Sequence, residues 1–309
     1  MNGARTARVK VPASTSNLGA GFDCVGVAVD RWITASASVD GGASSPRIVR
    51  SGTLKTLTHS AEDDLIHTGF RLACEASNAR PPRGVAYEVD STIPVARGLG
   101  ASAAALVAGV FLAKGALDLD LTPQAIAALC ASYEGHPDNV SPCVFGGAIL
   151  GVPTSEDGKT YAFSELRIHP GIALVFAVPE LMILTSAARR VLPESVSHTT
   201  AVRAAAKAAA LIDGLSTGNE RLLKFALDDV LHVPFRRHLI PGYDSIVGSA
   251  MKAGAYGATL SGSGSTMVAI AAREAAGEVG SAMQAAWQAT GQSAEVFISD
   301  RRVDGAKLE

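Results

Sequence analysis

The sequence predicts an α+β protein of two sub-domains. Segments with strand-like alternation are mixed with segments of helical periodicity, and no repeat of fixed period runs through the chain. After Pro193 the composition shifts towards long alanine-rich helices. At 309 residues, 48% of them hydrophobic, the chain is long enough for two ordinary domains. We place the join at residue 165, which gives an N-terminal domain over residues 1–165 and a C-terminal domain over residues 166–309.

The N-terminal half begins with strands. Residues 7–11 alternate like a strand that ends at Pro12, and residues 25–39 carry the β-branched content of one or two further strands. A loop over residues 40–46 leads to a strand at 47–50, and a helix at 65–77 precedes a strand at 85–89. Helices follow at 103–117 and from 123, where Thr122 and Pro123 form a capping signal.

The second half alternates in the same way. Residues 145–151 and 172–178 are expected to be buried strands, followed by helices at 199–215 and 219–231. The closing third predicts helices at 245–253 and 274–288 and strands at 258–260, 267–271 and 294–298. These elements complete the α+β prediction.

The composition argues against a nucleic-acid or membrane protein. Only 18% of residues are charged and the net charge is −2, so no electrostatic footprint for nucleic acid is expected. Residues 1–8 lack the apolar core of a signal peptide, and the most apolar window, 171–188, contains Pro179 and Glu180. The four cysteines have no CxxC spacing, which favours reduced, mostly buried thiols. We therefore expect a cytoplasmic protein.

The most informative segment is residues 94–104, PVARGLGASAA. A glycine turn here runs directly into an apolar helix, and the first amides of a helix lack partners and lie at its positive dipole end. Such a turn can hold a phosphate with no charged side chain. The alternative is a tight turn that only packs a helix on a strand.

Five segments in order carry a family resemblance. They are residues 9–23 (VKVPASTSNLGAGFD), the glycine turn, 134–140 (EGHPDNV), 232–236 (HVPFR) and 260–266 (LSGSGST). Together they resemble the GHMP small-molecule kinases, and within them the branch whose substrate is the amino acid L-homoserine. The resemblance implies a fold with a ribosomal-protein-S5-domain-2-like N-terminal domain, an unusual left-handed crossover, and a ferredoxin-like C-terminal domain. The active site would lie in the cleft between the two domains.

By this resemblance the phosphate donor is ATP with Mg²⁺. Ser102 and Glu134 match the family's metal-binding hydroxyl and carboxylate, a donor set that suits magnesium. The implied ATP-binding residues are Pro94, Val95, Ala96, Arg97, Gly98, Leu99, Gly100, Ala101, Ser102, Ala103, Ala104, Asp64, Gly262, Ser263 and Gly264. The chain departs from the family pattern at Ala101 (usually serine), Asp64 (commonly asparagine) and Ser265 (proline). These departures are expected to affect nucleotide contacts and the stiffness of the loop at residues 262–264, which the resemblance places against the phosphates.

The resemblance also implies the acceptor site. L-homoserine carries an ammonium, a carboxylate and a hydroxyl, and the residues that would bind it are Asn17, Asp23, His136, Asn139, Arg189 and Arg236. The planar fork of arginine suits the carboxylate. Asn139 and Thr185 would orient the hydroxyl, and Asp138 is the candidate general base. We favour positioning and charge stabilisation over base catalysis, because phosphoryl transfer through a loose transition state needs little help from a base.

Other functions remain open at this stage. The chain could phosphorylate another small alcohol, such as mevalonate or shikimate, or be a catalytically inactive ligand sensor. A nucleic-acid module is suggested only by the ribosomal-protein-like fold. A homodimer would fit the family.

Overall fold

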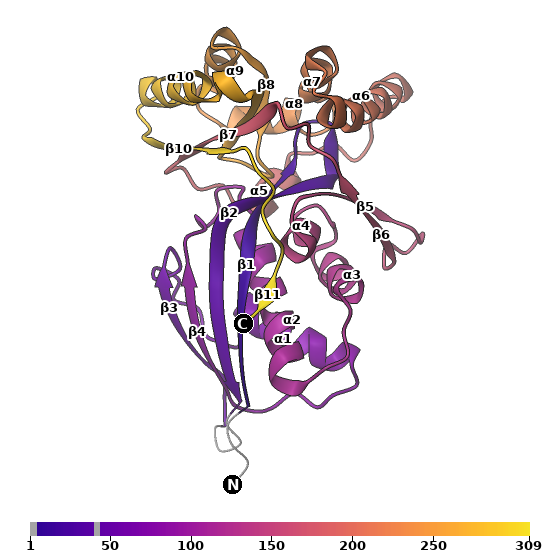
Figure 1. The fold of residues 1–309 in the computed structure, drawn as a ribbon, viewed down its shortest axis with the longest axis vertical. Coiled ribbons are helices and arrows are strands. Elements are labelled where there is room, and N and C mark those ends of the chain that lie inside the picture. Colours follow the sequence, from indigo (N-terminus) through magenta and orange to yellow (C-terminus); the bar gives the residue numbers. More distant parts are fainter. Residues whose placement is uncertain (1–4, 40–43) are drawn as a thin grey trace.

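Two β-sheets organise the chain in the computed structural model, which describes residues 5–39 and 44–309 (Figure 1). The first sheet has seven strands in the order β11-β1-β2-β4-β3, with β5 on β2 and β6 on β5. Its strands are β1 (Arg5–Asn17), β2 (Gly21–Val39), β3 (Arg47–Gly52), β4 (Val85–Ser91), β5 (Ala148–Pro153), β6 (Tyr161–Leu166) and β11 (Lys307–Leu308). The chain therefore begins and ends in this sheet.

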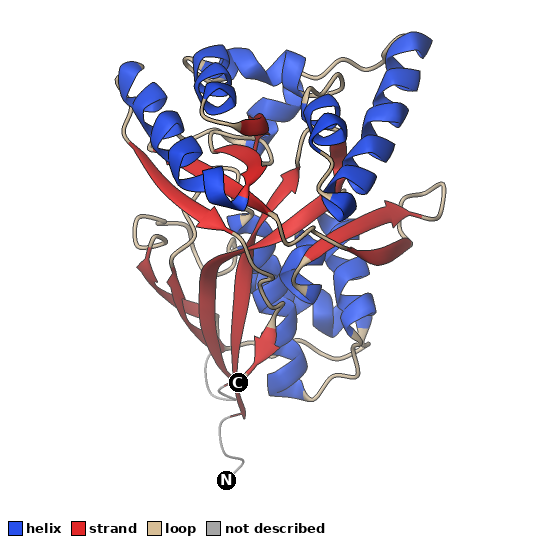
Figure 2. Cartoon of the chain, turned by 45° about the horizontal axis from the view of Figure 1, so that its top comes forward, coloured by secondary structure: helices blue, strands red, loops and turns tan. Residues whose placement is uncertain are grey.

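Four helices pack against one another and on the first sheet (Figures 1 and 2). They are α1 (Leu65–Ala76), α2 (Ala101–Leu117), α3 (Pro123–Glu134) and α4 (Val140–Phe145). Helix α2 is apolar along most of its length and buries residues on all sides, as expected for a central core helix. Thr122 caps α3 by accepting from the Ala125 amide, which confirms the predicted capping signal.

The second sheet is antiparallel, in the order β10-β7-β9-β8. Its strands are β7 (Ile172–Pro179), β8 (Ala255–Leu260), β9 (Met267–Ala272) and β10 (Ala294–Ser299). Both faces are covered, which explains why every residue of β7 is buried. Odd-numbered β7 residues pack with α9 (Tyr243–Lys252) and α10 (Ala276–Ala289), and even-numbered ones belong to the core that includes α6 (His198–Thr217) and α7 (Glu220–Leu227).

The α+β prediction is confirmed, with differences in detail. β1 continues through Pro12 instead of ending there, because a register shift between Pro12 and Ala13 accommodates the missing N–H. The helix expected at 219–231 ends at Leu227, where Asp229 accepts from the next amides and turns the chain. Residues 140–145 are helical, so the strand expected at 145 begins at Ala148. Short elements not anticipated are α5 (Thr185–Arg190), α8 (Val233–Arg236), β6, β11 and the 3₁₀ turns Arg237–Leu239 and Arg273–Ala275.

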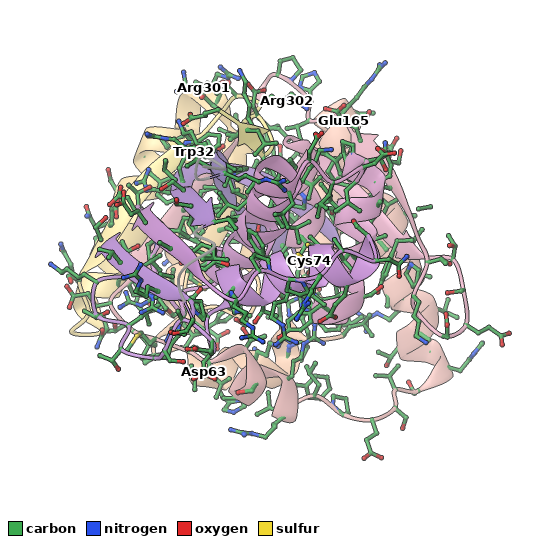
Figure 3. All side chains as sticks on the ribbon, turned by 90° about the horizontal axis from the view of Figure 1, so that it is seen from below. Trp32, Asp63, Cys74, Glu165, Arg301 and Arg302 are labelled. Atoms are coloured by element: carbon green, nitrogen blue, oxygen red, sulfur yellow. The ribbon has the colours of Figure 1, made fainter. Side chains whose placement is uncertain are left out.

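Other expectations concern domains, thiols and surface charge. β3 and β4 pair in parallel through α1; the handedness of this crossover and the join at 165 stay predictions. The loop predicted at 40–46 lies partly outside the described residues. All four cysteines are free, and three are buried. Among the described residues no helix is long and apolar enough to span a membrane. On the surface Arg302 pairs with Glu165 (Figure 3). Its neighbour Arg301 pairs with Asp30.

Candidate active site

A cavity of about 420 Å³ lies beside the glycine turn, α5 and the loop after β8. It brings together residues that the five sequence segments supply from far apart in the chain. Of the expected site residues, those lining it are Asn17, Asp23, Asp64, Pro94, Val95, Ala96, Arg97, Gly98, Leu99, Gly100, Ala101, Ser102, Glu134, His136, Asp138, Asn139, Thr185, Arg189, Arg236, Gly262 and Ser263. Ala103, Ala104 and Gly264 do not line it: all three are buried, and the Ala104 amide already donates to the Gly100 carbonyl.

The glycine turn requires its glycines. Gly98 and Gly100 have φ values of +75° and +68°, in the left-handed region that other residues avoid. A Cβ on Gly98 would lie 2.1 Å from the Ser261 carbonyl oxygen, and one on Gly100 would lie 2.1 Å from the Ser14 hydroxyl. Helix α2 begins directly afterwards with no side-chain cap on its amides. These donors at the positive end of a 17-residue helix form a suitable seat for an anion.

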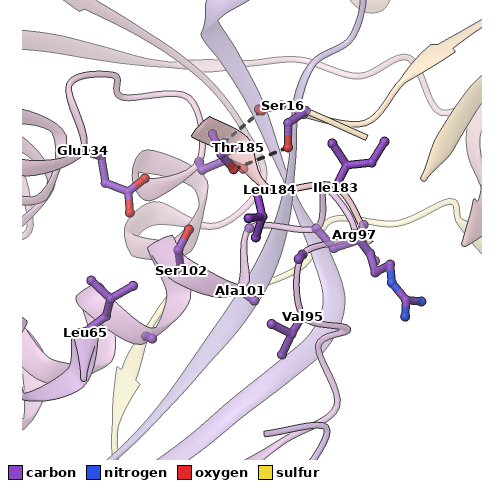
Figure 4. Close-up of a pocket in the computed structure, with 18 of the residues that line it drawn as sticks. Ser16, Leu65, Val95, Arg97, Ala101, Ser102, Glu134, Ile183, Leu184 and Thr185 are labelled. Atoms are coloured by element: carbon purple, nitrogen blue, oxygen red, sulfur yellow. Dashed lines mark hydrogen bonds between the residues drawn. The ribbon is translucent and has the colours of Figure 1, made fainter. Parts of the chain in front are cut away.

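Ser102 and Glu134 face the same part of this cavity (Figure 4). Glu134 is 13% exposed, and burial, its largest influence, raises the pKa of its carboxyl above the ordinary value. Among the described residues no hydrogen bond reaches this carboxylate, and the basic group paired with it is the imidazole of His136, whose Nε2 lies 3.9 Å away. A desolvated carboxylate next to a hydroxyl and a phosphate seat fits a small divalent cation. The donor set is therefore compatible with Mg²⁺.

Asp64 is fully engaged within the protein. Its Oδ1 accepts from the Ile66 amide and caps α1, while its Oδ2 accepts from Arg50 at 2.6 Å. His59 Nε2 lies 3.1 Å from the same oxygen. The carboxylate at this family asparagine position therefore joins the 50–64 segment to α1. Around it the cavity is lined by apolar side chains: Leu54, Leu57, Leu65, Ile66 and Val95.

Charges of both signs gather at the other end of the cavity. Arg189 donates to both carboxylate oxygens of Asp23, at 2.8 and 3.2 Å. Asp138 is buried, and its Oδ1 lies 2.6 Å from His136 Nδ1. Burial alone would lower the pKa of His136, but the hydrogen bond and negative charge of Asp138 raise it above its ordinary value. Such a surface matches a small ligand that carries both charges.

Arg236 reaches this end from α8. It is 2% exposed, and its Nε donates to the Ala188 carbonyl at 3.0 Å. Burial, and next the neighbouring charge of Arg189, lower the pKa of its guanidinium. Arg189 and Arg236 both line the cavity at this end.

Asn139 is held between the two ends. Its Oδ1 accepts from the Ser14 hydroxyl and its Nδ2 donates to the Ser16 hydroxyl, each at 3.0 Å. This network fixes which way the amide points. Thr185, at the start of α5, lies with its hydroxyl 3.5 Å from that of Ser263.

The loop after β8 connects the two sheets across the cavity. The Gly262 amide donates to the Ser16 carbonyl at 3.1 Å, and Asn17 Nδ2 donates to the Gly262 carbonyl at 3.0 Å. Ser265, at the family proline position, is fully buried and donates its hydroxyl to the Leu181 carbonyl. This bond restrains the loop, so the serine compensates in part for the rigidity of a proline.

Sequence reasoning missed part of the lining. Ser16 lies in the first motif directly before Asn17, and this position was a usable signal. The other lining residues that the sequence analysis did not single out are Leu54, Leu57, His59, Asp63, Leu65, Ile66, Ala105, Ile183 and Leu184. Leu65, Ile66 and Ala105 lie in the predicted helices α1 and α2, and the others reach the cavity because the fold brings their loops there.

Comparison with known proteins agrees with this geometry. The model of the GHMP kinases N terminal domain matches residues 64–147, and that of the GHMP kinases C terminal domain matches residues 208–289. Homoserine kinase of Nostoc punctiforme is 38% identical over 301 residues, 97% of each chain. Homoserine kinase of a Synechococcus strain is 37% identical over 308 residues, 98% of this chain and 97% of the relative.

A solved structure extends the similarity to three dimensions. The crystal structure of homoserine kinase from Cytophaga hutchinsonii superposes with a TM-score of 0.87 at 27% identity, covering 100% of this chain and 99% of the other. The match therefore includes both sheets of this chain. With the sequence relatives, it shows that this chain belongs to the GHMP kinase family, among the homoserine kinases.

Proposed function

We propose that this protein transfers the γ-phosphoryl group of ATP to the side-chain hydroxyl of L-homoserine, giving O-phospho-L-homoserine and ADP. The observation that carries the proposal is one cavity with an anion seat at one end and both signs of charge at the other. A nucleotide tail fits the first end and an amino-acid zwitterion fits the second. The hydroxyl of the amino acid would then lie between them.

At the donor end, the amides at the start of α2 would hold the phosphates. The apolar side chains around Asp64 would contact the base, because the Asp64 carboxylate is already occupied by Arg50 and the Ile66 amide. Ser102 and Glu134 would hold Mg²⁺, which neutralises phosphate charge when bound. The chain supplies the oxygen donors and a desolvated site, in which electrostatic interactions are stronger than in water.

At the acceptor end, Asp23 would bind the ammonium and Arg189 and Arg236 the carboxylate. In the protein Asp23 and Arg189 neutralise each other, and a zwitterion offers each of them a replacement partner of the right sign. An uncharged alcohol offers neither, and a hydroxy acid such as mevalonate offers only one. The two-signed pocket therefore favours an amino acid over the other small alcohols.

The transfer itself would rest on positioning. Asn139, fixed by Ser14 and Ser16, and Thr185 are placed to orient the hydroxyl. Asp138 accepts hydrogen bonds from His136 and Asn139, so its carboxylate is already engaged in holding these two side chains. As the new P–O bond forms and the bond to ADP breaks, the hydroxyl proton would pass to an oxygen of the transferred phosphoryl group, and a loose transition state makes this late transfer possible without a base.

ADP release tests this function directly. Purified protein with ATP and Mg²⁺ should release ADP with L-homoserine and not with mevalonate, shikimate or 4-hydroxybutyrate, and excess EDTA should stop the reaction. Equal rates with several alcohols would contradict the proposal, and ligand binding without ADP release would favour a sensor. We also infer a homodimer acting in the cytoplasm, which light scattering and cell fractionation test.

A further inference from the structure

His232 is a buried histidine beside the cavity with two different partners. Its ring is 0% exposed and does not line the cavity. Nε2 lies 3.1 Å from the Gly19 carbonyl oxygen, which can only accept, so Nε2 carries the hydrogen. Burial, its largest influence, lowers the pKa of His232 to about 4, so the ring is neutral at physiological pH. Nδ1 is then an acceptor, and it receives a hydrogen bond from Arg236 Nη1 at 3.3 Å.

The position of this ring is well determined. Asp229 accepts from the amides of His232 and Val233 at 2.7 and 2.8 Å and so fixes the start of α8. Phe22 stacks on the imidazole with 4.8 Å between ring centroids and 17° between planes. The Arg236 guanidinium lies 5.2 Å from the centre of the same phenylalanine. His232 is therefore held from both sides, by the second half of the chain and by the first.

The two partners of His232, Gly19 and Arg236, lie in the two parts of the site that are proposed to bind the ammonium and the carboxylate of the substrate. Gly19 lies in the tight 17–23 segment, whose Asn17 and Asp23 face the cavity. The segment has left-handed backbone at Asn17, Leu18 and Gly19, and its other backbone bond to this region runs from the Ala20 amide to the Ala226 carbonyl. Arg236 is the carboxylate partner in the proposed function. One imidazole is thus hydrogen-bonded both to the segment that carries Asp23 and to Arg236.

We propose that His232 is a positioning residue that holds Asp23 and Arg236 at the separation of an α-amino acid's two charges. The proposal rests on the proposed function. A neutral acceptor orients the Arg236 guanidinium without cancelling its charge, whereas a carboxylate in the same place would neutralise it. The Nε2–H donor holds the 17–23 segment by its main chain and makes no contact with the Asp23 carboxylate, whose partner in the protein is Arg189. Simultaneous binding of the substrate's ammonium and carboxylate thereby depends on His232, which contacts neither group.

Two substitutions separate the two bonds. In His232→Gln the amide nitrogen can donate to the Gly19 carbonyl, but no acceptor remains for Arg236. In His232→Asn the amide oxygen can accept from Arg236, but the Gly19 carbonyl loses its donor. Binding is measured by calorimetry with 4-hydroxybutyrate, which has the carboxylate alone, and 3-amino-1-propanol, which has the ammonium alone. We expect His232→Gln to weaken the first by about tenfold, the loss typical of a hydrogen bond to a charged group, and to spare the second. His232→Asn should do the reverse.

Further measurements decide the outcome. Both variants should raise KM for homoserine and leave KM for ATP and kcat within about threefold, and His238→Gln, on an exposed histidine nearby, should change nothing. Equal weakening of both probes, or a parallel loss of ATP affinity and melting temperature, would reduce His232 to a structural role. Nitrogen NMR of the wild-type imidazole needs no variant: an Nδ1–H tautomer or a charged ring at pH 7 overturns the proposal. A failure of the proposed function is seen separately, as no ADP release by the wild-type protein with homoserine.

Discussion

The two ends of the cavity are built from different materials. The donor end consists of main-chain amides, glycines and apolar side chains, with Ser102 and Glu134 at its edge. The acceptor end consists of charged side chains from distant segments, paired as Asp23 with Arg189 and His136 with Asp138. A site made of main-chain amides and glycines is disrupted when a side chain is added, because the new atoms displace the backbone. A site made of charged side chains is disrupted when one of those side chains is removed. Each end should therefore respond to a different class of substitution.

The largest effect is expected from adding one carbon at the donor end. In Gly98→Ala the new Cβ meets main-chain atoms that cannot move aside, and φ is positive, so the turn must shift. We expect kcat/KM to fall by at least about 100-fold, with a lower melting temperature, because a displacement of about 1 Å near reacting groups has that cost. The control is Gly248→Ala in α9, where nothing lies within 4 Å of the new Cβ and helix stability should rise. An active Gly98→Ala variant would show that the turn is not the phosphate seat.

The next effect comes from removing a charge at the acceptor end. Arg236→Leu should raise KM for homoserine at least about tenfold and leave KM for ATP nearly unchanged, since a charge-assisted hydrogen bond contributes about 1.5–3 kcal/mol. The matched control is Arg237→Leu, which removes an exposed arginine paired with Asp244. Steady-state kinetics and thermal melting of both variants separate binding from folding. An unchanged KM for homoserine in Arg236→Leu would show that this arginine does not contact the substrate.

A smaller effect is expected at Asp138. Asp138→Asn keeps an acceptor for His136 but removes the carboxylate, so kcat should fall by less than the roughly 100-fold that a general base contributes. KM for homoserine should rise, since His136 loses its charged partner. Single-turnover kinetics separates the chemical step from binding. If kcat vanished while both substrate affinities stayed intact, Asp138 would have to be the base and positioning would not be the main source of rate.

The smallest effect is expected at Ala101, where the chain departs from the serine of the family pattern. Ala101→Ser adds a hydroxyl at the first residue of α2, beside the phosphate seat. One added hydrogen bond contributes about 1 kcal/mol, so KM for ATP should fall about fivefold and KM for homoserine should not change. A rise in KM for ATP would mean that Ala101 packs against the nucleotide rather than leaving a contact unfilled.

The same contrast explains what could be predicted from the sequence. The donor end is local: residues 94–102 carry the turn and the helix start together, so the motif and its mechanism were readable. Ala103 and Ala104 are buried and do not line the cavity, so their assignment to the ATP site stays a prediction. The prediction that the first strand ends at Pro12 was wrong, because a register shift between Pro12 and Ala13 lets the strand continue past the proline.

The acceptor end is assembled over long distances. Asp23 and Arg189 are 166 residues apart, and only the family resemblance placed them in one site. His232 stood in a recognised motif, yet its partners Gly19 and Arg236 depend on how α8 meets the 17–23 segment. The leucines at 54 and 57 had no signal at all, because their importance comes from a loop that Arg50 and Asp64 hold in place.

The last strand has a mechanical consequence. The chain leaves the first sheet after β6 and returns to it as β11, where Lys307 and Leu308 pair with β1 and Glu309 bonds to Arg8. The half of the molecule that carries Arg189 and Arg236 is thus anchored by two crossings. Removal of residues 307–309 would delete the pairing with β1 and the Arg8 contacts, and with them one of these two crossings.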